Sequence, residues 1–141
     1  MRSALMRTRN DEKLLMWAMT AAVALGGALG SVLRFLVTQQ MLRFGAGFPY
    51  GTLLVNVVGS LLIGLFARMF MMPEASVVTR AALTVGFCGG FTTFSTYSVE
   101  IILLLEQGRT MRAFVYMFGS TSLALLATLA GLSLGARLVT R

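Results

Sequence analysis

The sequence contains no histidine, a single cysteine and few charged residues. Of its 141 residues, 57% are hydrophobic and 12% are charged, whereas soluble proteins carry about 25% charged residues. A chain this short and this apolar is therefore expected to be an integral membrane protein. It has no histidine, no cluster of cysteines and no pair of carboxylates within the apolar segments, so the usual catalytic groupings cannot form. We predict that the protein is not an enzyme.

The net charge of +7 would suggest a nucleic-acid partner in a soluble protein. Here lysine and arginine lie mostly in the tails and in the short connections between apolar segments. We therefore expect them to meet lipid headgroups and predict no nucleic-acid partner. Cys88 lies within an apolar segment without a second cysteine to pair with, so it says nothing about redox compartment.

Four apolar segments are long enough to cross a membrane as helices, which takes roughly 20 residues each. They cover about residues 14–36, 52–72, 77–105 and 113–134, after a charged N-terminal tail at residues 1–13. Because the connections are short, successive helices must run antiparallel. We predict an all-α integral membrane protein with a single four-span domain over residues 1–141. A cleaved signal peptide is the alternative for the first segment, but that segment is as long as a full span.

The third segment is longer than one span requires, and its middle is polar. Residues Gly86 to Glu100 combine the pair Gly89 and Gly90 with six hydroxyl-bearing residues. Glycine permits unusual backbone dihedrals, and hydroxyls can bind the backbone groups that an interrupted helix frees. We predict two half-helices with a break near Gly89–Thr93, with a long tilted helix as the alternative. Irregular backbone at this depth survives only inside protein or beside a water-filled path, so the break marks the expected functional site.

Polar residues at helical spacing mark one face in each of the other segments. Arg34 ends a small-residue stripe in the first segment, and a guanidinium there must reach the interface, pair, or hold an anion. Thr52 and Asn56 are four residues apart in the second segment, as are Tyr116 and Ser120 in the fourth. The amide of Asn56 has two donors, which could serve a neighbouring helix or a passing anion equally well.

Positive charge is almost evenly divided between the two sides of the membrane once the N-terminal tail is set aside. Four antiparallel spans leave four arginines on each side: Arg68, Arg80, Arg137 and Arg141 on one, and Arg34, Arg43, Arg109 and Arg112 on the other. So weak a bias does not fix one orientation, and we expect insertion in both. A single topology with the N-terminus inside is the alternative, which the basic tail favours.

Glu100 is the only acidic residue well inside a predicted span. A lone carboxylate in the membrane suits proton coupling, so a proton-coupled small multidrug-type exporter is the rival function. Exporters of that class are similar in size but carry their essential glutamate in the first span, where this chain has none. A packing or anchoring subunit without transport activity is a third possibility.

Three segments together resemble the Fluc/CrcB fluoride channel family. They are GGALGSVLR at residues 26–34, GTLLVNVVG at 51–59 and GFCGGFTTFSTYS at 86–98. The resemblance covers all four spans in the correct order, and the third-span tract is its most specific part. It implies a passive, fluoride-selective channel in the cell inner membrane that lowers cytoplasmic fluoride. It also implies an antiparallel, dual-topology homodimer with a structural sodium ion at the dimer interface.

By position, the resemblance gives roles to particular residues. It implies a fluoride pathway that includes Asn56, Thr52, Thr93, Arg34 at a vestibule, Phe94 and Tyr97 as an aromatic box, and Tyr116 and Ser120 along a polar track. The backbone carbonyls of Gly89 and Thr92 from both subunits would hold sodium.

Two positions depart from the family pattern. Tyr97 stands where the family usually has phenylalanine, and Ala124 stands where it often has serine. The polar track is therefore expected to be less complete at Ala124, with Thr121 or Ser122 as candidate substitutes.

Overall fold

The computed structural model describes residues 2–44, 47–71 and 75–139, with side chains from Arg9 onward. Its helices are α1 (Arg2–Met41), α2 (Tyr50–Met69), α3 (Val77–Ala81), the π-helix η1 (Ala82–Cys88), α4 (Gly89–Phe91), α5 (Phe94–Glu106) and α6 (Thr110–Val139). Four helical stretches are long and apolar enough to span a membrane: Arg9–Met41, Tyr50–Met69, Val77–Glu106 and Thr110–Val139. The predictions of an all-helical chain and of a membrane location are confirmed.

Some of the predicted boundaries fall outside the described residues. These are the end of the second segment at Met72, the start of the following connection at Pro73, Gly45 in the first connection, and the C-terminal Arg141. Helix α1 begins at Arg2 and therefore includes the residues of the predicted charged N-terminal tail from there on.

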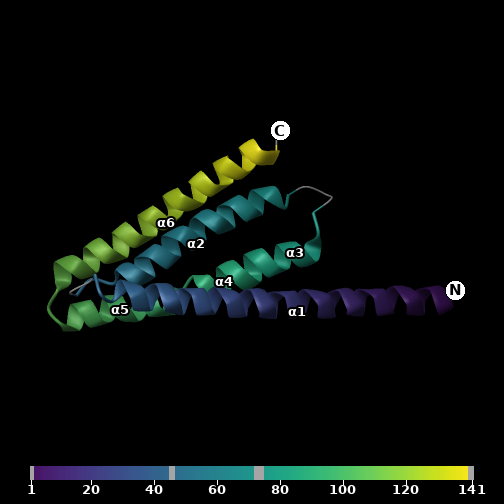
Figure 1. The fold of residues 1–141 in the computed structure, drawn as a ribbon, viewed down its shortest axis with the longest axis horizontal. Helices are drawn as coiled ribbons and strands as arrows, with labels where there is room; N and C mark the ends of the chain where they lie inside the picture. The colour runs from purple at the N-terminus through teal and green to yellow at the C-terminus, as the bar shows by residue number, and fades with distance from the viewer. Residues whose placement is uncertain (1, 45–46, 72–74, 140–141) are drawn as a thin grey trace.

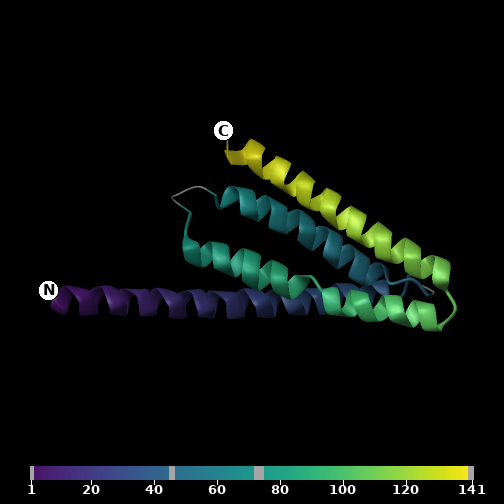
Figure 2. The same cartoon turned by 180° about the vertical axis from the view of Figure 1, so that it is seen from behind.

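The helices are arranged in two pairs. Figures 1 and 2 show α3, η1 and α4 lying along α1, while α2 and α6 lie side by side. The N-terminal part of α1 extends beyond all the other helices. Helix α5 continues the third span beyond a bend and packs against α6, so the bend lies between the two pairs.

Glycines bring the helices of each pair into backbone contact. A Cβ atom on Gly30 of α1 would collide with the Phe87 carbonyl oxygen of η1, and one on Gly131 of α6 would collide with the Leu61 carbonyl oxygen of α2. Helices in lipid gain no hydrophobic free energy from association, so close packing of this kind has to hold them together. The small-residue stripe of the first segment therefore serves helix packing.

The third span is interrupted within the predicted range. Helix α4 ends at Phe91, and the backbone is extended at Thr92 (φ −85°, ψ 160°) and at Thr93 (φ −150°, ψ 114°). The glycine pair does not supply the irregular dihedrals, since Gly89 is itself helical (φ −64°, ψ −37°). Gly90 instead allows close approach, because a Cβ atom there would collide with the Gly27 carbonyl oxygen of α1.

Candidate functional site

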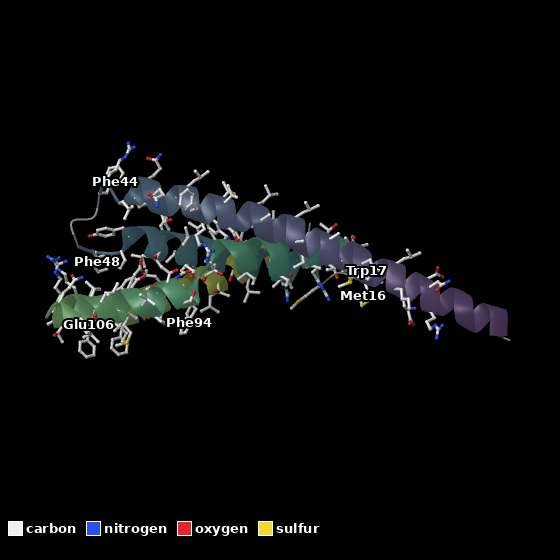
Figure 3. All side chains as sticks on the ribbon, turned by 90° about the horizontal axis from the view of Figure 1, so that it is seen from below. Met16, Trp17, Phe44, Phe48, Phe94 and Glu106 are labelled. Carbon is white, nitrogen blue, oxygen red and sulfur yellow. The ribbon has the colours of Figure 1, made fainter. Side chains whose placement is uncertain are left out.

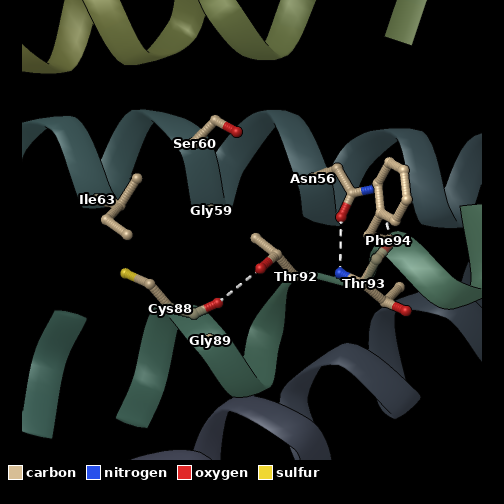
Figure 4. Close-up of a pocket in the computed structure, with 9 residues that line it drawn as sticks. All are labelled: Asn56, Gly59, Ser60, Ile63, Cys88, Gly89, Thr92, Thr93 and Phe94. Atoms are coloured by element: carbon tan, nitrogen blue, oxygen red, sulfur yellow. Dashed lines mark hydrogen bonds between the residues drawn. The ribbon is translucent and has the colours of Figure 1, made fainter. Parts of the chain in front are cut away.

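Asn56 on α2 holds the interrupted backbone of the third span. Its Nδ2 atom donates to the Thr93 carbonyl oxygen at 3.1 Å, and the Thr93 amide donates to its Oδ1 atom at 2.8 Å (Figure 4). The Thr93 hydroxyl in turn caps α5 by accepting from the Thr96 amide at 3.2 Å. One Nδ2 hydrogen of Asn56 has no acceptor among the described residues. The Asn56 amide thus pairs with the backbone of the third span and has one N–H group left that can donate to another ligand.

A cavity of about 220 Å³ lies beside this contact. Its lining includes Asn56, Ser60, Gly89, Thr92, Thr93 and Phe94 (Figure 4). The Phe94 ring points away from the helices and is 79% exposed (Figure 3). Amide, hydroxyl and aromatic groups therefore meet at the bend.

The bend also frees backbone carbonyl groups from their helical donors. The Thr93 amide would donate to the Gly89 carbonyl in a continuous helix, but it donates to Asn56 instead. The Gly89 residue is exposed, and the space next to its Cα atom is open. Carbonyl oxygens are the ligands that a hard cation such as sodium prefers, so the freed carbonyl oxygens at the bend suit such an ion.

Arg34 lies at the same bend. Its Nη1 atom donates to the Thr92 carbonyl oxygen at 3.3 Å. The family resemblance implies a vestibule role in which Arg34 draws anions inward. The structure places its guanidinium on one of the two carbonyls predicted to hold sodium, where the positive charge satisfies a freed backbone acceptor.

Aromatic rings form a chain from the bend to Phe48, in the connection between α1 and α2. The ring centroids of Phe94 and Tyr97 are 5.6 Å apart, those of Tyr97 and Tyr116 5.2 Å, and those of Tyr116 and Phe48 5.5 Å. Tyr97 is 8% exposed. Its hydroxyl donates to the Met117 carbonyl at 2.7 Å and lies 3.0 Å from the Thr121 hydroxyl. The tyrosine hydroxyl therefore fastens α5 to α6.

Glu100 brings together two of the predicted pathway residues. Its Oε1 atom accepts a hydrogen bond from the Thr52 hydroxyl at 2.8 Å, and its Oε2 atom accepts one from the Tyr116 hydroxyl at 2.7 Å. Thr52 is 2% exposed and Tyr116 is fully buried. From the sequence alone, Glu100 is only a proton-coupling candidate. A carboxylate inside a membrane needs hydrogen-bond donors, and this need is the signal that could have linked Glu100 to the hydroxyls of Thr52 and Tyr116.

The predicted site residues thus fall into two groups. Asn56, Thr93, Phe94, Arg34, Gly89 and Thr92 gather at the bend. Beyond it, Tyr97 of α5 contacts Tyr116 of α6, and Glu100 of α5 joins Tyr116 to Thr52 of α2. Ser120 is buried on α6, one turn from Tyr116. No group of three His, Cys, Asp or Glu side chains that could hold a metal is present in the described part of the chain.

Comparison with known proteins gives consistent matches over most of the chain. Residues 21–132 match the family described as CrcB-like protein, Camphor Resistance (CrcB). The chain is 47% identical over 123 residues to the fluoride-specific ion channel FluC of Nitrobacter winogradskyi, covering 84% of this chain and 95% of that relative. It is 52% identical over 114 residues to FluC of Rhizobium meliloti (79% and 91% covered). It is 49% identical over 118 residues to FluC of Thermus thermophilus (83% and 93% covered).

Proposed function

Because this chain belongs to the CrcB/FluC family of membrane channels, we propose that it conducts fluoride passively and selectively and so lowers fluoride in the cytoplasm. The structural observation that carries the proposal is the bend in the third span, where Asn56, Thr93 and Phe94 line one cavity. The relatives are named as ion channels and not as enzymes, which agrees with the prediction from composition.

The chemistry of fluoride explains why these groups suit it. The ion is small and strongly hydrated, so a pore has to replace its water with hydrogen-bond donors. Asn56 has a donor in reserve, and the positive edge of the Phe94 ring can face an anion. We assign the pathway to Asn56, Thr93 and Phe94 at the bend, continuing past Tyr97, Thr52, Tyr116 and Ser120.

Flux from liposomes tests the function. Liposomes that contain only this protein should release fluoride without a proton gradient or nucleotide, and they should release chloride far more slowly. Comparable chloride flux would contradict selectivity. Fluoride or drug movement that requires a proton gradient would favour the proton-coupled exporter, with Glu100 as its coupling group. In the structure both carboxylate oxygens of Glu100 already accept hydrogen bonds from hydroxyls.

We also propose that the working unit is an antiparallel homodimer. The exposed Gly89 backbone and the exposed Phe94 ring both lie at the bend and leave room for a second copy there. The even division of arginines between the two sides supports insertion in both orientations. Closed twofold pairing is the commonest arrangement for two identical chains.

Labelling reads the orientation directly. A single cysteine placed at the C-terminus in a Cys88→Ser background should react with impermeant reagent from both sides of the membrane.

Two or three lysines added to the connection at residues 43–50 should bias the chain to one orientation and lower activity. Co-expression of an oppositely biased copy should restore it. Wild-type chains that label from only one side would refute dual topology.

Sodium is proposed as a structural ion of this dimer. The Gly89 and Thr92 carbonyls of two copies would supply four oxygen ligands around a twofold axis, with each Thr92 oxygen using its second lone pair, because Arg34 already donates to it. A bound sodium ion supplies positive charge that offsets the crowded carbonyl dipoles. Purified protein should therefore unfold at a higher temperature in sodium chloride than in equal potassium chloride. Identical unfolding temperatures in the two salts would argue against the site.

A further inference from the structure

Two arginines converge on the connection between α1 and α2. Arg109, just before α6, and Arg112, in its first turn, each place Nη1 3.4 Å from the Gly47 carbonyl oxygen. Gly47 has φ +88°, and a Cβ atom there would collide with the Arg109 guanidinium. Only glycine suits this position, so the backbone is shaped to receive the guanidinium groups.

The positive charge of this pair is not neutralised within the described residues. No carboxylate there forms an ion pair with either guanidinium, and their shared acceptor is a neutral carbonyl. The two like charges that meet on one oxygen repel each other, and a nearby anion would offset this repulsion. The N-terminal end of the 30-residue helix α6 adds further positive potential at the same place.

Arg109 of this pair lines a cavity that also reaches Glu100, and Arg112 lies beside Arg109 at the shared Gly47 carbonyl oxygen. Arg109, Gly47, Phe48 and Glu100 all line this cavity of about 230 Å³. Glu100 also lines a smaller cavity of about 70 Å³ together with Thr52. Figure 3 shows Phe48 and Glu106 at this end of the molecule, away from the bend. A carboxylate in a narrow cavity repels anions, so an anion can use this route only where positive charge lies close by.

We propose that Arg109 and Arg112 form a capture site for small inorganic anions at this outer end of the pathway. The pair concentrates fluoride where the pathway meets water and offsets the negative charge of Glu100. This inference rests on the proposed channel function. The same guanidinium chemistry would also bind a lipid phosphate, and the experiment separates the two sources.

The test uses the full-length protein in planar bilayers at low fluoride concentration. The double variant Arg109→Gln/Arg112→Gln should carry about tenfold less fluoride current at low ionic strength. The loss should largely disappear in about 1 M of an impermeant salt, which screens charge beyond roughly 3 Å. Arg109→Lys/Arg112→Lys keeps the charge and should retain most of the current. Arg137→Gln, near the opposite end of α6, is the matched control and should behave as wild type.

Inorganic phosphate provides a second probe that does not depend on conduction. It should bind wild type in calorimetric titration and block its current, and both effects should weaken about tenfold in the double Gln variant. Size-exclusion chromatography checks that the variants assemble.

Equal currents and equal phosphate binding in wild type and the folded double Gln variant would overturn the capture site. The capture site would also be overturned if the double Gln variant carried wild-type current at all ionic strengths while lipid phosphate raised the unfolding temperature of wild type but not of the variant. That result would assign the two arginines to lipid binding. A wild type without fluoride current contradicts the channel function, whereas the phosphate titration still decides the inference.

Discussion

Replacing Asn56 with leucine is expected to abolish fluoride flux and to destabilise the fold. The substitution removes both hydrogen bonds to the Thr93 backbone and the reserve donor at the cavity. Each of the two buried Thr93 backbone groups left unpaired costs about 1–3 kcal/mol, so we expect a loss of roughly 2–6 kcal/mol in the free energy of unfolding. Losing about 3 kcal/mol of anion stabilisation corresponds to roughly a hundredfold lower flux. Liposome flux and thermal unfolding measure the two effects.

Asn56→Asp separates the two roles of this side chain. The carboxylate still accepts from the Thr93 amide, so assembly should be retained better than in Asn56→Leu. It offers no donor and carries negative charge, so fluoride flux should still be lost. Wild-type flux in a folded Asn56→Leu variant would place the fluoride-binding donors elsewhere.

Replacing Phe94 with isoleucine should reduce fluoride flux at least about tenfold, the equivalent of roughly 1.4 kcal/mol, while the protein still assembles. Isoleucine keeps apolar bulk but lacks the positive ring edge that can face an anion. Stability should change little, because the Phe94 ring is mostly exposed. Liposome flux and size-exclusion chromatography are the measurements.

Phe114→Ile is the matched control for this substitution. Phe114 is an exposed aromatic residue on α6 whose ring stacks with that of Phe118 at 6.2 Å, away from the cavity at the bend. It should leave flux unchanged, and Tyr97→Phe should retain most flux because its ring edge remains. If Phe94→Ile conducts like Phe114→Ile, the Phe94 ring is a packing element and the pathway runs elsewhere.

The sequence predicts the helices and the bend because these features depend on local patterns. Four long apolar stretches specify four spans, and glycine with threonine in the third marks a weak point. The exact position of the bend was not predictable. It falls at Thr92 and Thr93 because Asn56, far away in sequence, supplies the partners of the Thr93 backbone.

The partners of charged side chains were also beyond the sequence. Arg34 was expected at a vestibule, and the structure shows which carbonyl it binds. Glu100 stood out as a lone acid, but its two donors come from α2 and α6. Contacts between separate helices depend on how the helices cross, which helical periodicity alone does not determine.

The length of α1 has a consequence for how the protein is made. Its 40 residues correspond to about 60 Å of helix at 1.5 Å per residue, roughly twice the thickness of a hydrocarbon core. The N-terminal part of α1, which carries Asp11, Glu12 and Lys13, therefore projects into water beyond Trp17. In an antiparallel pair, the charged N-terminal part of α1 in one copy has to cross the membrane during insertion. In the proposed dimer, the energetic cost of the two orientations would therefore fall on membrane insertion.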